Sequence, residues 1–191
     1  GMGARFNRDG LDGVQVHITN TSNLPVEAME MEYPLRILHY GLVKDSGGPG
    51  ENRGGMAIRK DILALAPVLF SAHSDRHLIP PWGLEGGLPG KTGLFLLNSG
   101  TSRRKKIPSK ITGLLLGEGD VLSAATAGGG GYGSPSERLP EKVLADFKAG
   151  KITQAQAKKA YGVIFKGKKR INQEKTVKLR QQIEQNKVKK Q

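Results

Sequence analysis

The chain of 191 residues has no cysteine, one tryptophan and an aromatic content of only 5%. Without cysteine it can form no disulfide, no thiolate metal site and no cysteine nucleophile. No apolar run approaches the roughly 18 residues that span a membrane, and the N-terminal segment GMGARFNRDG lacks the apolar core of a signal peptide. These absences predict a cytoplasmic protein without a membrane partner, whose core is built from Leu, Ile, Val and Ala.

Glycine and proline, in contrast, are abundant, with 27 and 10 residues. They follow no Gly-X-Y period, which excludes a collagen-like chain. Their distribution between short apolar segments predicts many tight turns between short strands.

Positive charge dominates, with 30 Lys and Arg against 17 Asp and Glu, but it is unevenly distributed. Residues 1–102 hold 9 basic and 10 acidic residues, whereas residues 103–191 hold 21 and 7. The excess is concentrated in RRKKIPSK (103–110) and in the segment 166–191. The basicity therefore belongs to one loop and a tail rather than to the body of the domain.

The first 127 residues contain a series of short extended runs separated by turn-forming residues. In the first, GVQVHIT, Val14, Val16 and Ile18 alternate with polar residues, as expected for a half-buried strand. This spacing predicts a mainly β protein with an antiparallel sandwich or barrel-like body. The predicted strands cover 13–19, 34–43, 56–65, 66–75, 93–98, 111–116 and 120–127.

The pattern changes at Ser134 and predicts a small C-terminal helical part. Pro140 is a favourable first helical residue and Gly150 a favourable stop, while Thr153 can cap a second short helix that ends at Gly162. The last 26 residues have too few apolar positions for a buried face, so we expect a solvated helix or a disordered tail. The predicted units are a β-rich domain (1–133), a helical hairpin packed on it (134–165) and a basic tail (166–191).

Two glycine-rich segments resemble nucleotide loops but lack the required context. GGLPGKTG (86–93) has Glu85 where a phosphate loop needs its first glycine, and a strand-like run follows it. In ATAGGGGYGSPS (125–136) the spacing GxGxxG is present, but two prolines follow in place of a helix, and no carboxylate lies about 20 residues on. We therefore expect a plain turn at the first segment. At the second, the alternatives are a plain exit turn or a backbone that closely approaches a ligand or another chain.

Two polar clusters are candidate contact sites. His17, Thr19 and Asn20 offer several donors and acceptors on the polar side of a predicted strand. A second cluster is His73, Asp75, Arg76 and His77. With four histidines in the chain and no helical His-x-x-x-His pair, we expect no metal site, and a structural hydrogen-bond network of Asp75 with Arg76 is the simpler interpretation.

The basic segments contain no interleaved aromatic residue that could stack on bases. We therefore expect no specific nucleic-acid binding, only nonspecific contact of the tail with polyanions at low salt. A stand-alone scaffold or polyanion-binding module that uses the basic C-terminus remains the alternative function.

Several consecutive segments together resemble the hydantoinase B family, which includes the B subunits of ATP-dependent N-methylhydantoinases, the matching half of 5-oxoprolinase, and related ketone carboxylase and caprolactamase subunits. The resemblance runs from about residue 8 to residue 165. The segments are DGLDGVQVHITNTSNLPVEAMEMEYPLRI, DSGGPGENRGGMAIRKDI, HSDRHLIPPWGLEGGLPG, IPSKITGLLLGEGDVLSAATAGGGGYGSPSER and VLADFKAGKITQAQAKKAYGV.

The resemblance implies a B component of an ATP-dependent cyclic-amide hydrolase, of the hydantoin or 5-oxoproline type. ATP with Mg is then expected on an A-type partner subunit, and this chain is expected to bind no cofactor itself. The family's B subunits are far longer, and the matched blocks resemble their C-terminal portion. The resemblance therefore also implies an N-terminal B-like partner portion, where a divalent metal is expected, and a chain that is inactive alone.

The same resemblance places the glycine run near the active centre or a subunit interface, with Ala127 where proline is usual. The residues expected to contact a substrate or the interface are His17, Thr19 and Asn20, then Asp75 and Arg76 as an orienting pair, and Gly129, Gly130 and Gly131 through their backbone.

Overall fold

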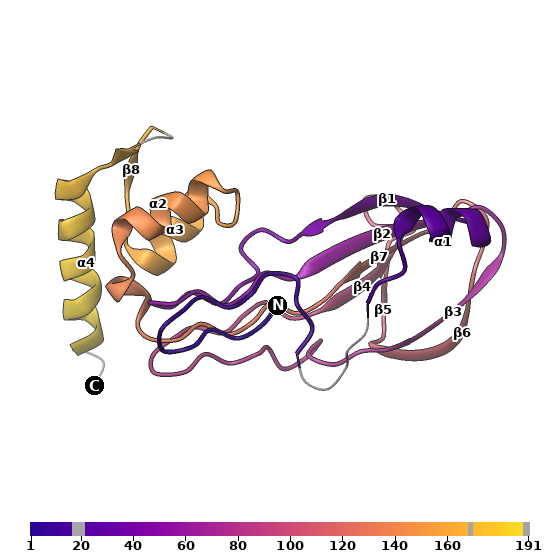
Figure 1. The fold of residues 1–191 in the computed structure, drawn as a ribbon, viewed down its shortest axis with the longest axis horizontal. Coiled ribbons are helices and arrows are strands. Elements are labelled where there is room, and N and C mark those ends of the chain that lie inside the picture. Colours follow the sequence, from indigo (N-terminus) through magenta and orange to yellow (C-terminus); the bar gives the residue numbers. More distant parts are fainter. Residues whose placement is uncertain (17–21, 168–169, 189–191) are drawn as a thin grey trace.

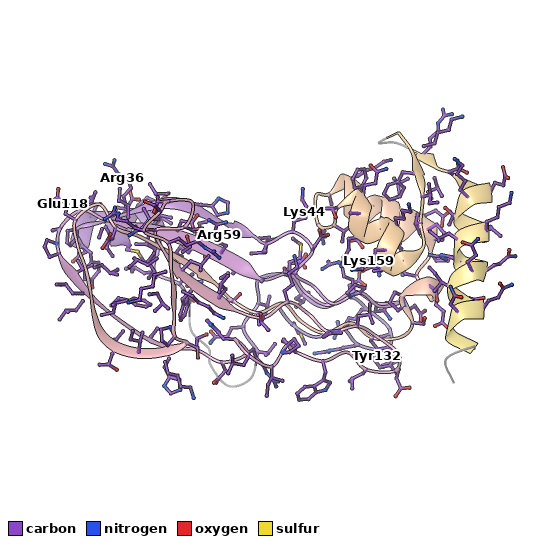
Figure 2. The ribbon with its side chains drawn as sticks, turned by 180° about the vertical axis from the view of Figure 1, so that it is seen from behind. Arg36, Lys44, Arg59, Glu118, Tyr132 and Lys159 are labelled. Carbon is purple, nitrogen blue, oxygen red and sulfur yellow. The ribbon has the colours of Figure 1, made fainter. Side chains whose placement is uncertain are left out.

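A computed structural model describes residues 1–16, 22–167 and 170–188 of the chain. The molecule is elongated, with the two larger sheets at one end, most of the helices at the other, and irregular segments between them (Figure 1). The labelled side chains of Figure 2 mark these zones: Arg36 and Glu118 lie at the strand end, and Lys159 lies on the helices. The N-terminus lies in the middle zone, and the last described residues lie at the helical end.

The strand end consists of two antiparallel sheets that face each other. The larger sheet has five strands in the order β1-β2-β7-β4-β5, and the smaller pairs β3 with β6. The larger sheet contains β1 (Leu35–Leu42), β2 (Ile58–Ala64), β7 (Val121–Ala125), β4 (Leu94–Leu97) and β5 (Lys105–Ile107). The smaller contains β3 (Val68–His73) and β6 (Lys110–Leu116).

The apolar core of this end lies between the two sheets. Register places Ile62 of β2 opposite Leu122 of β7, which in turn lies opposite Leu97 of β4, so one row of apolar side chains shares a face. Leu122 packs with Leu116 of the smaller sheet in one buried cluster. The two sheets therefore form an open sandwich, which confirms the mainly β prediction and decides between its two forms, since the described strands close no barrel.

Six of the predicted strands are present as β1, β2, β3, β4, β6 and β7, but the prediction at 13–19 is wrong for its described part. Residues 14–16 are not in a strand, and Val14 and Val16 are exposed. Their alternation is real, but no described strand pairs with them; residues 17–19 lie outside the described residues. Two elements are not predicted by the sequence pattern, namely β5 within the basic loop and the short helix α1 (Val26–Glu32), which has no buried residue.

The middle zone is a layer of glycine-rich backbone, formed by residues 1–10, 46–55, 82–90 and 128–133. These segments bond to one another through their main chains: the Gly48 amide donates to the Gly129 carbonyl, the Gly129 amide to Gly55, and the Gly131 amide to Leu88, at 2.8, 2.8 and 3.0 Å. Tyr132 bridges to segments on both sides of it. We refer to this arrangement as the glycine layer.

Side chains are excluded from the interior of the glycine layer by the closeness of its segments. A Cβ at Gly129 would overlap the Met2 carbonyl, and one at Gly130 would overlap the Trp82 carbonyl. Only glycine allows backbones to approach so closely. The glycine run at 128–131 is therefore neither a turn nor a nucleotide loop, but an extended segment packed between other segments.

The helical end is built from α2 (Pro140–Lys148), α3 (Gln154–Tyr161) and α4 (Gln173–Val188), with the short elements η1 (Pro135–Glu137), β8 (Phe165–Lys166) and β9 (Arg170–Ile171). The predicted caps are present. Thr153 accepts a hydrogen bond from the Gln156 amide at 3.1 Å, and Gly162 ends α3 with φ +64°.

A second apolar core holds the helical end together, with Val143, Tyr161 and Phe165 among its buried residues. The tail contributes to this end through α4, where Thr176 is buried and Arg180 donates to the carbonyls of Tyr161 and Arg138, at 3.1 and 2.7 Å. These contacts are polar, which explains why a search for apolar positions gives α4 no buried face.

Candidate functional site

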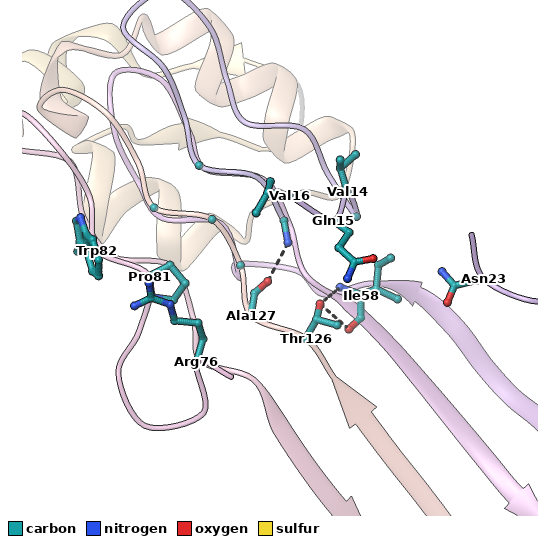
Figure 3. Close-up of a pocket in the computed structure, with 16 residues that line it drawn as sticks. Val14, Gln15, Val16, Asn23, Ile58, Arg76, Pro81, Trp82, Thr126 and Ala127 are labelled. Carbon is teal, nitrogen blue, oxygen red and sulfur yellow. Dashed lines mark hydrogen bonds between the residues drawn. The ribbon is translucent and has the colours of Figure 1, made fainter. Parts of the chain in front are cut away.

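A cleft with a volume of about 600 Å³ lies along one border of the glycine layer. Its floor is main chain of 127–130, one wall is formed by Val14, Gln15 and Val16, and the opposite side carries Arg76, Pro81 and Trp82 (Figure 3). The cleft thus combines apolar walls with a floor in which no side chain separates a ligand from the backbone.

The floor of the cleft is fixed by hydrogen bonds between residues that are far apart in sequence. The Thr126 hydroxyl accepts from the Ile58 amide at 3.0 Å, which joins the end of β7 to the start of β2. The Gly1 ammonium donates to the Ala127 carbonyl at 2.9 Å (Figure 3). These bonds hold the cleft residues at the junction between the sheet and the glycine layer.

Arg76 is the charged side chain of the cleft and is held in an unusual way. Its guanidinium carbon lies 4.7 Å from the centre of the Trp82 ring, within the range of a cation–π contact. Its backbone has φ +60°, a left-handed conformation that is uncommon for residues other than glycine. Such strained positions occur preferentially at functional sites.

The neighbouring residues of the second polar cluster point elsewhere. Asp75 pairs with Lys110 at 3.7 Å and not with Arg76, so the expected orienting pair is not formed in this structure. His77 bonds to Ser74 at 3.1 Å and packs its ring against Phe95, with 4.7 Å between ring centres. Burial, with a contribution from nearby Lys106, lowers the pKa of His77.

Three of the residues predicted from the sequence therefore meet at the cleft, namely Arg76, Gly129 and Gly130. Gly131 lies in the same glycine run but does not line the cleft. His17, Thr19 and Asn20 lie outside the described residues. The sequence interpretation missed Trp82, although a lone tryptophan in a proline- and glycine-rich loop is a signal that could have identified it.

A buried ionic cluster lies where the glycine layer meets the helices. Arg138 donates to both carboxylate oxygens of Asp9 at 2.7 Å and to Asp146 at 2.8 Å. Arg53 donates to Asp12 at 3.0 Å, and Lys151 contacts the same carboxylate at 2.8 Å. The two arginine side chains are each only 2% exposed, so this ionic cluster is part of the interior.

The charges of the ionic cluster shift the pKa values of its acids. Burial alone would raise the pKa of Asp12, but hydrogen bonds from Lys151, the Met56 amide and Arg53 lower it to about 2. Burial would likewise raise the pKa of Asp9, but its bonds to Arg138 keep that pKa below the usual range. Both aspartates are therefore charged at neutral pH and bind the arginines to the N-terminal segment.

Neither glycine-rich segment has the structure of a nucleotide loop. The segment 86–93 leads into strand β4, and the run 128–131 leads into the short 3-10 helix η1. A phosphate loop requires an α-helix directly after the glycines. Within the described ranges, no group of three or more His, Asp or Glu is arranged to hold a metal ion, and no helix is long and apolar enough to cross a membrane.

A sequence model of the hydantoinase B/oxoprolinase family matches residues 1–135, which includes the sandwich, the glycine layer and every described residue of the cleft. The chain belongs to the hydantoinase B/oxoprolinase family. Among its relatives, a protein from Pseudomonas sp. (strain NS671), named as the B subunit of a D-/L-hydantoinase, is 38% identical over 179 residues, or 93% of this chain.

Two solved structures share the fold of this family member. The ATP-dependent caprolactamase from Pseudomonas jessenii superposes with a TM-score of 0.73 and 28% identity, covering 82% of this chain and 28% of the other. A nucleotide-free acetone carboxylase gives a TM-score of 0.81 over 97% of this chain and 30% of the other, at 21% identity. The chain spans about 30% of the length of the hydantoinase relative that it matches.

Proposed function

We propose that this chain is part of the B component of an ATP-dependent cyclic-amide hydrolase, of the hydantoin or 5-oxoproline type. The observation that carries the proposal is the 38% identity to the B subunit of a hydantoinase over 93% of the chain. The likeness to an ATP-dependent caprolactamase, at 28% identity, supports the same class of reaction.

The chemistry of this class requires activation, because an amide carbonyl is a poor electrophile. We propose that the γ-phosphoryl group of ATP passes to the amide oxygen and ADP leaves, which makes the carbonyl carbon electrophilic. Water then adds to this carbon and the ring C–N bond breaks, which leaves a free amine and an acyl phosphate. A second water adds to the acyl carbon, and phosphate departs with the oxygen it received, which leaves a carboxylate. In this proposal the partner subunit binds ATP. The structure supports this, because neither glycine-rich segment of the described chain has the form of a phosphate loop.

The partners in this proposal are an A-type subunit, which binds ATP with Mg, and an N-terminal B-like portion, for which a divalent metal is expected. This chain contributes the cleft, in which the backbone of 127–130 and the side chains of Arg76 and Trp82 contact the ring or the adjoining subunit. The proposal places the chain in the cytoplasm, where ATP is available.

A chimera tests the proposal directly. The matching region of the D-/L-hydantoinase relative from Pseudomonas sp. is replaced by this chain and purified with the corresponding A-type subunit. We expect ring opening of a hydantoin that requires ATP and yields one ADP per ring opened. A folded complex of the same size as the parent that opens no ring, while the parent complex does so, would contradict the proposal.

A polyanion-binding module is the competing function, and the structure allows a cleaner test than removing the tail. Deleting 166–191 would also remove α4, whose Thr176 and Arg180 contribute to the helical end. Replacing exposed lysines of α4 by glutamine removes charge and leaves this packing intact.

A further inference from the structure

We propose that the cleft selects cyclic amides that carry an anionic substituent, and that Arg76, held against Trp82, is the residue that recognises the anion. The inference rests on the proposed function, because it names the class of ring that the cleft takes. It distinguishes carboxylate-bearing lactams and hydantoins from neutral ones, a distinction that membership of the family leaves open.

Arg76 is held at the cleft on a strained backbone. Its φ of +60° is unfavourable for a residue with a Cβ, and glycine would avoid this strain. Its neighbour Asp75 pairs with Lys110. The Arg76 guanidinium instead lies over the Trp82 ring at the cleft (Figure 3).

The charge of the cleft also favours an anionic ligand. Its described lining contains no Asp or Glu, and among the described residues the Arg76 side chain forms no ion pair or hydrogen bond. A guanidinium stacked on a ring by its face keeps the N–H groups of its edge available for a carboxylate. The Gly1 ammonium, in contrast, already donates to the Ala127 carbonyl. Arg76 is thus the cation of the cleft with unused donors.

The remaining walls of the cleft fit a small ring with amide groups. Val14, Val16, Ile58 and Pro81 are apolar and can cover the faces of a small ring, while the glycine backbone lets the ring approach the floor. Gln15 and Asn23 supply amide groups that can bond to a ring N–H or carbonyl. An apolar slot with amide partners and one cation fits a cyclic amide with one negative charge.

The lone tryptophan makes the inference directly measurable. Since Trp82 is the only tryptophan of the chain, its fluorescence reports on occupancy of the cleft. The probes are 5-oxoproline and its neutral carboxamide, which have the same ring and nearly the same size but differ in charge. We expect saturable quenching by both, with the carboxylate binding at least about tenfold more tightly, as a charge-assisted pair provides.

Two variants assign the preference to Arg76. Arg76→Met should abolish the difference between the probes and leave the affinity for the carboxamide within about twofold, which is within the range of a neutral substitution. Arg76→Gly should behave in the same way and also removes the backbone strain, so it provides a variant that folds without cost. Arg104→Met, which removes an exposed cation outside the cleft, should retain the full preference.

Three results would overturn the inference: equal affinity for the two probes, no quenching by either, or a preference that survives Arg76→Met. None of them bears on the proposed function, because the titration uses this chain alone and the chimera measures ATP-dependent ring opening. If the chimera opens rings but the cleft binds the two probes with equal affinity, only the role of Arg76 is rejected and the proposed function stands.

Discussion

Arg138 joins three parts of the chain that are far apart in sequence. It bonds to Asp9 in the N-terminal segment, to the Glu51 carbonyl in the glycine layer and to Asp146 in α2. Burial by itself would lower the pKa of this guanidinium, but the two carboxylates raise it above its usual value, so it stays charged. Its contribution is a fixed orientation of the helices on the glycine layer.

Arg138→Met should lower the free energy of unfolding by about 3–5 kcal/mol, because Asp9 loses its ion pair and Asp146 keeps only the longer contact with Arg53, at 3.6 Å. Urea unfolding followed by circular dichroism measures the change. Lys178→Met provides the control, because its pair with Glu174 is exposed and should change stability by less than about 1 kcal/mol. Equal effects of the two substitutions would show that the buried pairs add nothing to stability.

Asp12 gives the protein a stability that depends on pH. Its pKa is about 2 in the folded chain and about 3.9 when unfolded, so the unfolded state binds more protons in this interval. The stabilisation is complete above about pH 4 and is lost as the pH falls toward 2. Asp12→Asn should make the free energy of unfolding less dependent on pH in this window. An unchanged slope in the variant would contradict the assignment.

At the scale of residues, the sequence reveals part of the site. Arg76, Gly129 and Gly130 are predicted as contacts and do line the cleft, but the predicted pair of Asp75 with Arg76 is not formed in this structure. That pair is predicted from adjacency in the sequence, whereas Asp75 pairs with Lys110 and Arg76 lies over Trp82. The partners of Arg138 are beyond prediction, since Asp9 lies 129 residues away in the chain.

At the scale of elements, the glycine run 128–131 is the segment around which the middle of the molecule is built. Gly129→Ala places a Cβ against the Met2 carbonyl, and because that contact is backbone it cannot be relieved by turning a side chain. We expect the substitution to lower the free energy of unfolding by about 3 kcal/mol or more. Thermal unfolding detects a loss of this size.

Gly117→Ala is the matched control for this prediction. A Cβ at Gly117 meets only a carboxylate oxygen of Asp120, at 3.6 Å, and its φ is not in the left-handed region. The substitution should therefore change stability by less than about 1 kcal/mol. If both alanines were tolerated equally, the packing described for the glycine layer would be incorrect.

The strands and helices are largely predictable from the sequence, and the glycine layer is not. Short apolar runs between turn-forming residues identify six strands, and proline, threonine and glycine at the predicted positions bound α2 and α3. In the glycine layer the segments are extended but have no alternation of apolar and polar side chains. Their glycine-rich composition therefore cannot be distinguished from that of turns. Strand β5 is not predicted because Lys105 and Lys106 give this segment the composition of a solvated loop.

At the scale of the whole molecule, the uneven charge raises the question of a polyanion partner. Lys175 and Lys178 are exposed on α4, and neither belongs to the ionic cluster. The double substitution Lys175→Gln and Lys178→Gln should leave activity and assembly of the chimera unchanged. Binding of a polyanion that this double substitution abolishes, with an affinity in the unsubstituted protein that falls steeply as salt rises, would favour the polyanion-binding function.

The central claim of the proposed function is that this chain works together with an A-type ATP-binding subunit, and it rests on the 38% identity to a protein named as a hydantoinase B subunit. The most direct measurement is affinity purification of the tagged chain from cells that encode it, with identification of the bound proteins by mass spectrometry. The account predicts recovery of an A-type ATP-binding subunit together with a B-like polypeptide, retained through a high-salt wash. Recovery of the chain alone, or only with nucleic acid that salt removes, would contradict it.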